Sequence, residues 1–245
     1  MLLQGSAKTA TKKLFLFPDG SGSATSYISI PNLGPDVAIY GMNCPFMKDP
    51  KNYLVGIDGV SLLYMNEMKR RQPEGPYYIG GWSAGGVVAY EVAVQLMARG
   101  EKVEKLLLID SPCPVKLEPL PARLHHFFDQ IGLLGTGGTG SSPEWLLPHF
   151  EYSIKALSAY EPQAMPKGQA PSTFAIWATD GVCGKPNDPR PPPAEGEDPK
   201  PMKWLLDNRT DFGDNGWGQL LGDSMVFDTI SSCNHFTMMT DEFVS

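Results

Sequence analysis

The feature that most constrains the fold of this chain is a glycine-rich turn between an apolar run and a helical pattern. The run covers residues 77–80, the turn is Gly81-Trp82-Ser83-Ala84-Gly85, and apolar side chains then recur four residues apart from Val88 until Gly100. In a sharp strand-to-helix turn of the form G-x-S-x-G, the positions flanking the serine crowd the backbone and need glycine. We therefore predict that Ser83 projects from a strand end at the start of a helix. The alternative is a glycine-rich turn that happens to contain a serine.

The alternation of strands and helices extends over the rest of the chain. Apolar residues at helical spacing cover residues 61–71. The other predicted strands are short apolar runs bounded by turn residues, at 13–17, 36–41, 103–109, 173–178 and 224–230. Strands that alternate with helices pair in parallel, and parallel sheets bind ligands at the carboxyl ends of their strands. The sequence thus predicts an α/β domain with its functional site at that edge.

Two stretches interrupt this alternation. Residues 112–169 separate neighbouring strands by more than a crossover helix requires, and they contain helical patterns around 122–131 and 143–160 with a flexible run at 135–140. An insertion at the carboxyl edge of a sheet often forms a lid or a pocket wall, so we expect a helical lid. Residues 185–203 are rich in proline and acidic residues, which predicts an exposed loop.

A serine hydroxyl becomes an effective nucleophile only when a base takes its proton. The chain has four histidines, of which His125, His126 and His149 lie in the predicted lid. For these three we expect an ordinary surface or lid-helix role. His235 follows the last predicted strand, which is where the chain order Ser, Asp, His places the base for Ser83. The alternative for His235 is a structural role.

Two aspartates are candidates for the acid that orients His235. Asp110 ends the strand after the helix that follows Ser83, and Asp180 ends the next strand. Both lie at strand-to-turn junctions on the same predicted edge, so either could reach the imidazole. From spacing and composition the choice stays open, and the other aspartate would be a turn former.

Backbone N–H groups are expected to stabilise the oxyanion that forms during acyl transfer. One donor is the N–H of Ala84, because the residue after the nucleophile faces the site. The second is expected in the loop after the first strand of the motif set, residues 18–22, with Gly20 as the first candidate and Ser21 as the next. The alternative for this loop is a plain turn.

Composition excludes several other classes of function. The chain carries 20 Lys and Arg against 27 Asp and Glu, a net charge of −7, which argues against nucleic acid as a partner. It has no apolar run near the roughly 20 residues needed to cross a bilayer. Four dispersed cysteines without a CxxC pair favour free thiols in a cytoplasmic protein. No cluster of His, Cys and carboxylates has metal-ligand spacing, so we expect no metal site.

Four segments are together typical of one protein family. They are residues 15–23, 80–86, 107–112 and 234–239, which read FLFPDGSGS, GGWSAGG, LLIDSP and NHFTMM. On these segments the chain resembles the C-terminal thioesterase/Claisen-cyclase domain of fungal non-reducing iterative polyketide synthases, enzymes of secondary metabolism. The resemblance covers the chain from about residue 12 to its end. It implies an α/β-hydrolase fold, in which helices flank a mostly parallel central sheet and a helical lid covers an acyl chamber.

The resemblance also implies roles for single residues and for partners. It assigns the acid to Asp110 rather than Asp180, so the implied triad is Ser83, His235 and Asp110. A poly-β-keto acyl chain would arrive on the phosphopantetheine of an acyl carrier protein of the same synthase and be transferred to Ser83. Release would follow by Claisen cyclisation, lactonisation or hydrolysis, with no cofactor bound by the domain itself.

The domain organisation that the resemblance implies divides the chain at its start. Residues 1–11 would be a linker from an upstream carrier-protein region, and residues 12–245 the thioesterase domain. The family's helix after the histidine motif is expected to be cut short at residues 242–245.

Two further points remain alternatives at this stage. Apolar residues of the lid are expected either to line the acyl chamber or to pack as ordinary core; they are Phe127, Phe128, Trp145, Leu146, Leu147 and Phe150. Rival functions are a free-standing serine esterase acting on small esters and a non-catalytic ligand-binding module with the same fold. A binding module would be expected to lack a member of the triad, and the sequence contains candidates for all three.

Overall fold

The computed structural model of the chain describes residues 1–134 and 143–240. The flexible run predicted at 135–140 and the shortened helix expected at 242–245 lie outside the described residues.

One sheet contains the seven strands of the described chain, in the order β1-β3-β2-β4-β5-β6-β7. Strand β1 pairs antiparallel with β3, and all other neighbours pair in parallel. The strands are β1 (Leu2–Gln4), β2 (Lys12–Phe17), β3 (Val37–Gly41), β4 (Tyr77–Trp82), β5 (Val103–Ile109), β6 (Ser172–Asp180) and β7 (Met225–Asn234). The helices are α1 (Gly56–Arg71), α2 (Ala84–Met97), α3 (Ala122–Gln130), α4 (Leu146–Ser158), α5 (Lys200–Leu206) and α6 (Gly218–Leu221), with short 3-10 turns η1 (Ala24–Tyr27), η2 (Pro50–Asn52) and η3 (Thr237–Met239).

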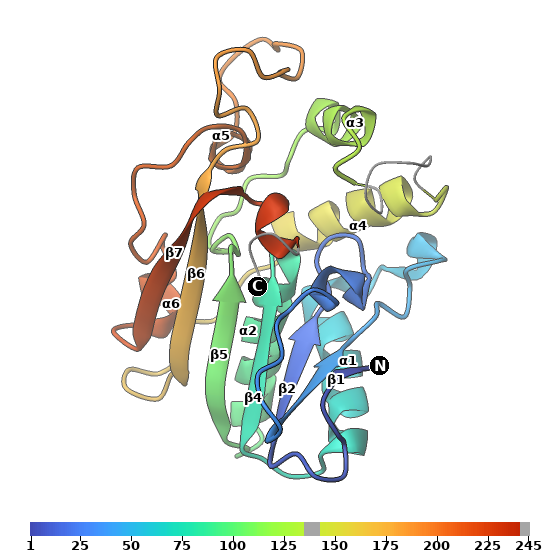
Figure 1. Ribbon diagram of the computed structural model, residues 1–245, viewed down its shortest axis with the longest axis vertical. Helices are drawn as coiled ribbons and strands as arrows, with labels where there is room; N and C mark the ends of the chain where they lie inside the picture. The colour runs from blue at the N-terminus through green and yellow to red at the C-terminus, as the bar shows by residue number, and fades with distance from the viewer. Residues whose placement is uncertain (135–142, 241–245) are drawn as a thin grey trace.

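The core lies on both faces of the sheet because side chains alternate along each strand. Phe15 and Phe17 of β2 pack into the main core with α1 and α2, which cover one face (Figure 1). Leu16, between them, belongs to a second cluster on the opposite face. Helix α2 is buried along nearly its whole length, which explains its uniformly apolar sequence.

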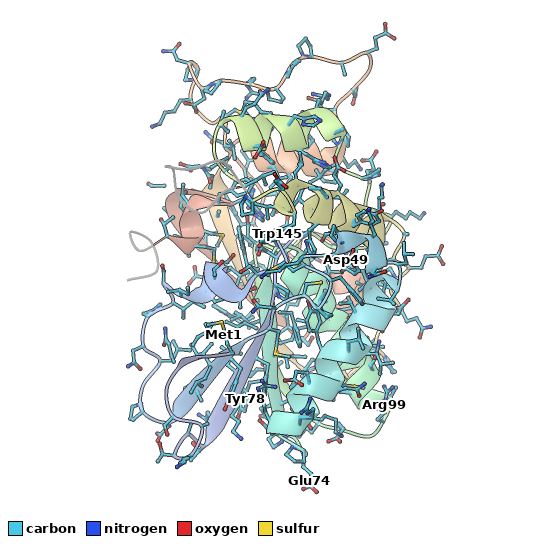
Figure 2. The ribbon with its side chains drawn as sticks, turned by 90° about the vertical axis from the view of Figure 1, so that its right-hand side faces the viewer. Met1, Asp49, Glu74, Tyr78, Arg99 and Trp145 are labelled. Carbon is cyan, nitrogen blue, oxygen red and sulfur yellow. The ribbon has the colours of Figure 1, made fainter. Side chains whose placement is uncertain are left out.

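Helices α3, α4 and α5 lie beyond the carboxyl ends of the strands (Figure 1). Phe128 of α3 packs in one cluster with Met202 and Leu206 of α5. Figure 2 shows Glu74, which precedes β4, at the bottom of the view and Trp145, which precedes α4, well above it near the middle. The predicted insertion therefore stands over the edge of the sheet where the candidate site residues were expected.

Strand β1 is not among the strands predicted from the sequence. The segment 1–11, for which the sequence predicts a linker, contributes residues 2–4 to the sheet. Without β1, strand β3 would leave a row of backbone groups unpaired at the sheet edge. The Met1 amino group donates a hydrogen bond to the Gly41 carbonyl at 2.6 Å, and Leu3 packs against the second core cluster.

Two helices also differ from their predicted limits. Helix α1 begins at Gly56 rather than at residue 61, because buried Ile57 and Val60 extend the apolar stripe of the helix. Helix α5 begins at Lys200, inside the region 185–203 predicted as a loop. Its first turn contains Pro201, and proline is tolerated at that point of a helix because the N–H there needs no intrahelical partner.

Two further features concern the cysteines and the helices. All four cysteines carry free thiols. Among the described helices, none has the length and apolar character needed to span a membrane.

Candidate active site

Ser83 lies at the junction between β4 and α2, in a strained backbone conformation with φ of +56°. A Cβ atom on Gly81 would lie 2.2 Å from the carbonyl carbon of Gly85, and a Cβ on Gly85 would lie 2.2 Å from the Phe17 oxygen. Both flanking positions therefore need glycine, as the sequence analysis expects. The Ser83 N–H donates to the Ile109 carbonyl at 2.9 Å, which ties the turn to the neighbouring strand β5.

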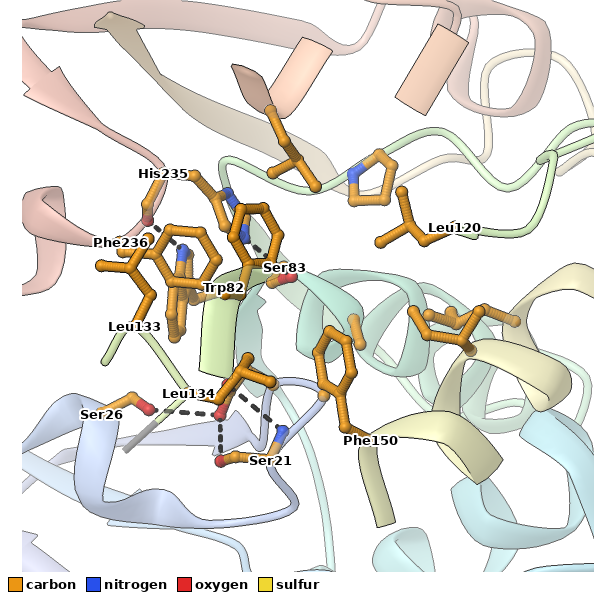
Figure 3. Close-up of a pocket in the computed structure, with 18 of the residues that line it drawn as sticks. Ser21, Ser26, Trp82, Ser83, Leu120, Leu133, Leu134, Phe150, His235 and Phe236 are labelled. Atoms are coloured by element: carbon orange, nitrogen blue, oxygen red, sulfur yellow. Dashed lines mark hydrogen bonds between the residues drawn. The ribbon is translucent and has the colours of Figure 1, made fainter. Parts of the chain in front are cut away.

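The structure brings Ser83, His235 and Asp110 into one chain of hydrogen bonds. His235 Nδ1 lies 2.8 Å from Asp110 Oδ2, and His235 Nε2 lies 3.0 Å from Ser83 Oγ (Figure 3). His235 is 4% exposed and Asp110 is fully buried. Because an ionised carboxylate only accepts hydrogen bonds, Nδ1 carries the proton and Nε2 presents its lone pair to the serine hydroxyl.

Asp110 is held as an anion by its partners. Burial opposes its ionisation, but hydrogen bonds and charges from His235 and Arg209 outweigh that effect and lower its pKa. The Arg209 guanidinium binds the carboxylate in a bidentate manner, with Nη1 to Oδ1 and with Nη2 to Oδ2 at 2.9 Å. The Ala178 N–H adds a further donor to Oδ1 at 3.1 Å. Asp110 therefore accepts hydrogen bonds on both oxygens.

Arg209 is a site residue that the sequence analysis missed. It follows α5 in a loop, and its guanidinium carbon lies 3.6 Å from the centre of the Trp204 ring. Its Nη1 also donates to the Ala178 carbonyl at 2.9 Å, and its Nε donates to the Trp204 carbonyl at 3.2 Å. No motif surrounds Arg209, and it lies 99 residues from Asp110 in the chain, so no sequence signal points to it.

Asp180, the other candidate acid, does not take part in this chain of hydrogen bonds. Its Oδ1 accepts a hydrogen bond from the hydroxyl of neighbouring Thr179 at 2.7 Å. In the part of the chain that the structure describes, His235 makes no hydrogen bond to Asp180. The geometry thus separates two aspartates that spacing leaves equivalent.

The two candidate oxyanion donors line the same cavity as Ser83. Ala84 and Gly20 both border it, and neither backbone N–H has a hydrogen-bond partner among the described residues. The N–H of Ser21, the second choice in that loop, donates instead to Asp19 Oδ2 at 3.3 Å. These contacts leave Ala84 and Gly20 available to a substrate oxygen.

His149 of helix α4 contacts the same loop, a feature that the predicted lid role does not include. It is 1% exposed, and its Nδ1 donates to the Gly20 carbonyl at 3.1 Å. Its ring stacks on Tyr53 with centroids 5.7 Å apart, and its Nε2 has no hydrogen-bond partner in the described chain. Burial lowers the pKa of His149, so the ring is a neutral donor that connects the lid to the loop after β2.

A cavity of about 590 Å³ opens from Ser83 and His235 beneath the lid helices (Figure 3). Its walls are mostly apolar. Of the six lid residues considered from the sequence, four line it: Phe128, Trp145, Leu146 and Phe150. Phe127 instead packs in the cluster between α3 and α5, and Leu147 is not part of the lining. Within the described ranges, no group of three or more metal-ligating side chains could hold a metal ion.

Comparison with known proteins gives matches over the whole chain. The family described as "Thioesterase domain" matches residues 12–133. Non-reducing polyketide synthase Preu8 of Preussia isomera is 66% identical over 239 residues, which are 98% of this chain and 11% of that protein. Non-reducing polyketide synthase PKS1 of Zymoseptoria tritici is 63% identical over 245 residues, which are 100% of this chain and 11% of that protein. The chain thus spans about a tenth of the length of these relatives.

Solved structures give matches of the same kind. The NocB thioesterase domain, in a covalent complex with a fluorophosphonate nocardicin G analogue, has a TM-score of 0.71 at 22% identity, covering 97% of this chain and 91% of that one. RedJ, a thioesterase from the prodiginine pathway of Streptomyces coelicolor, has a TM-score of 0.68 at 17% identity, covering 98% and 90%. At these identities the likeness concerns the fold, and it confirms the predicted α/β-hydrolase class.

Proposed function

The chain belongs to the thioesterase-domain family, and on that premise we propose that it releases a polyketide acyl chain from a carrier protein. The observation that carries the proposal is the hydrogen-bonded series Asp110, His235, Ser83, which ends in a large apolar cavity. The similarity over the whole chain to non-reducing polyketide synthases supports a polyketide as the acyl group. The same similarity supports delivery on the phosphopantetheine of an acyl carrier protein.

In the first step the acyl group moves from sulfur to Ser83. His235 Nε2 takes the proton of the serine hydroxyl while Oγ attacks the thioester carbonyl carbon. The N–H groups of Ala84 and Gly20 hold the oxyanion, and a single such donor contributes about 3 kcal/mol to transition-state stabilisation. The C–S bond then breaks, the thiolate takes the proton from His235, and the acyl chain is left as an ester on Ser83. Asp110 holds the Nδ1–H of the imidazole throughout.

In the second step a nucleophilic atom of the bound acyl chain attacks the ester that links this acyl chain to Ser83. For Claisen release, His235 removes a proton from a methylene between two carbonyls, and the resulting carbanion attacks the ester carbonyl. A C–C bond forms, the bond to Ser83 Oγ breaks, and Oγ takes back the proton. The apolar cavity supports this route, or lactonisation by an enol oxygen, over hydrolysis because it excludes water and holds the chain folded.

The proposal is tested by covalent labelling and by product analysis. A fluorophosphonate should label the wild-type protein and not Ser83→Ala. A polyketide mimic carried on pantetheine should be released by the wild type, with the product identified by mass spectrometry. Labelling that persists in Ser83→Ala would remove the serine from its role. Rapid turnover of small oxygen esters with none of acyl-pantetheine would identify an esterase instead.

A further inference from the structure

Two acidic residues line the described cavity, Asp19 and Glu118, and Asp19 lies at the same edge of the sheet as Asp110. Strand β4, which leads to Ser83, lies between β2 and β5 in the sheet. Asp110 follows β5, and Asp19 follows β2, so the two aspartates flank the serine at the same edge of the sheet. Asp19 lines the cavity together with Ser21 and Ser26, and Figure 3 shows these two serines across the pocket from His235.

The hydrogen bonds of Asp19 leave one of its oxygens only partly engaged. Oδ1 accepts from the Ser21 hydroxyl at 2.8 Å and from the Ser26 hydroxyl at 3.2 Å. From the residues that the structure describes, Oδ2 accepts one hydrogen bond, from the Ser21 N–H at the long distance of 3.3 Å. Because each carboxylate oxygen has two acceptor positions, Oδ2 can accept a further, shorter hydrogen bond.

The surroundings of Asp19 favour the binding of a further hydrogen-bond donor at Oδ2. Among the described residues, no lysine or arginine pairs with this carboxyl group. Most of the cavity wall is apolar, and four of its polar residues come from the segment that follows Asp19: Ser21, Ser23, Thr25 and Ser26. The lining also contains the polar residues Glu118, Ser158 and Thr240. Burial raises the pKa of Asp19, although the hydrogen bonds from Ser21 and Ser26 lower it in part. A polar group left short of partners in such a site costs free energy that a ligand hydroxyl can recover.

We propose that Asp19, held by Ser21 and Ser26, is a subsite that binds a hydroxyl group of the acyl chain, whether alcohol, phenol or enol. The inference rests on the proposed function, because it concerns the same cavity and names the class of acyl group that the cavity selects. One anchored oxygen fixes which carbons of the chain lie near Ser83. A site that hydrogen-bonds a substrate hydroxyl discriminates strongly against the analogue that lacks it.

The alternative role for Asp19 is to brace, that is to stabilise, its own loop, since its carboxylate accepts a hydrogen bond from the Ser21 N–H. The two roles differ in their dependence on the ligand. A brace affects the binding of every acyl chain equally, whereas a subsite affects only chains that carry the hydroxyl. A comparison of two ligands that differ in this one group therefore separates the two roles.

The test uses unreactive amide analogues of octanoyl-pantetheine and 3-hydroxyoctanoyl-pantetheine, with dissociation constants measured by calorimetry. The wild type should bind the hydroxylated analogue about tenfold more tightly, the effect of one hydrogen bond to a charged group. Asp19→Asn, which presents an amide in place of a carboxylate oxygen, should abolish most of that preference. Ser26→Ala should reduce it about threefold, because Asp19 loses a hydrogen bond that holds its carboxylate in one orientation toward the ligand.

Ser158→Ala provides a matched control, because Ser158 also lines the cavity but donates to the Lys155 carbonyl in its own helix. This variant should retain the wild-type preference. Equal affinities of the wild type for both analogues, or an equal loss for both in Asp19→Asn, would overturn the subsite. If Asp19→Asn does not fold, the comparison of Ser26→Ala with Ser158→Ala decides the matter. Binding is measured without turnover, so a failure of the proposed function would appear separately, as absent release of the thioesters.

Discussion

Asp19 and Asp110 follow strands on either side of β4, yet their surroundings differ in kind. Asp110 is enclosed and contacts a guanidinium and an imidazole, whereas Asp19 is half-buried and its hydrogen-bond partners among the described residues are Ser21 and Ser26. Burial opposes ionisation at both. At Asp110 the hydrogen bonds and charges of His235 and Arg209 outweigh burial and lower the pKa, and at Asp19 burial prevails and raises it.

The difference teaches that position in the fold does not decide what a carboxyl group does. Asp19 and Asp110 follow parallel strands at equivalent positions, yet their pKa values shift in opposite directions, because within the described chain a cation contacts only one of the two. Pairs of carboxyl groups whose pKa values are driven apart often divide roles in an active site. Asp110 is suited to remain an anion that orients the imidazole, and Asp19 is suited to exchange hydrogen bonds with a ligand.

The largest expected effect is on the rate of acyl transfer, which should depend much more on Asp110 than on Asp19. Asp110→Asn should lower kcat/KM for an acyl-pantetheine thioester by about 10⁴-fold, because the amide no longer holds His235 with its lone pair toward Ser83. Asp19→Asn should lower it far less for the same unsubstituted chain. Asp180→Asn serves as the control and should retain wild-type turnover. A loss in Asp180→Asn as large as that in Asp110→Asn would contradict the assignment of the acid.

A smaller effect concerns the cation that distinguishes the two sites. Arg209→Met should lower the free energy of unfolding by about 3–5 kcal/mol, because it leaves the carboxylate of Asp110 buried with its charge poorly compensated. The double variant Asp110→Asn/Arg209→Met removes both charges and should be more stable than Arg209→Met alone. Urea unfolding of the four proteins measures this cycle. Additive losses would mean that the pair does not interact as the geometry indicates.

The smallest effect is a difference in the pH dependence of stability. The native pKa of Asp110 is lowered, so its stabilising contribution is present above the unfolded value of about 3.9 and is lost as the pH falls through the native value. The native pKa of Asp19 is raised, so its contribution is complete below about 3.9 and is lost as the pH rises through the native value.

Urea unfolding between acid and neutral pH measures both slopes against the matched amide variants. The stability of the wild type relative to Asp110→Asn should increase with pH, and its stability relative to Asp19→Asn should decrease. Slopes of the same sign would remove the contrast between the two sites.

Much of the site follows from local sequence signals. The apolar runs that end in turn residues predict the parallel strands, and the glycines around Ser83 predict the strained turn because no other residue fits there. His235 follows from its place after the last predicted strand. All of these features depend on residues close together in the chain, or on the order of the strands.

The remaining features depend on contacts between distant segments. Asp110 and Asp180 carry the same local signal, and only the packing of His235 against the sheet distinguishes their geometry. Arg209 lies in an irregular loop, so its approach to Asp110 has no periodic or motif signature. Strand β1 forms because β3 offers an open edge, which the apolar residues at positions 2 and 3 do not reveal by themselves.

The hydrogen bond from His149 to the Gly20 carbonyl has a consequence for how domains of this family can diversify. Helix α4 forms part of the chamber wall and also supports the peptide group that precedes Ser21. Exchanging the lid for one of another shape, by evolution or by grafting, removes that support unless the new segment supplies its own donor at the same point. The shape of the chamber and the position of the loop after β2 are therefore inherited together in this architecture.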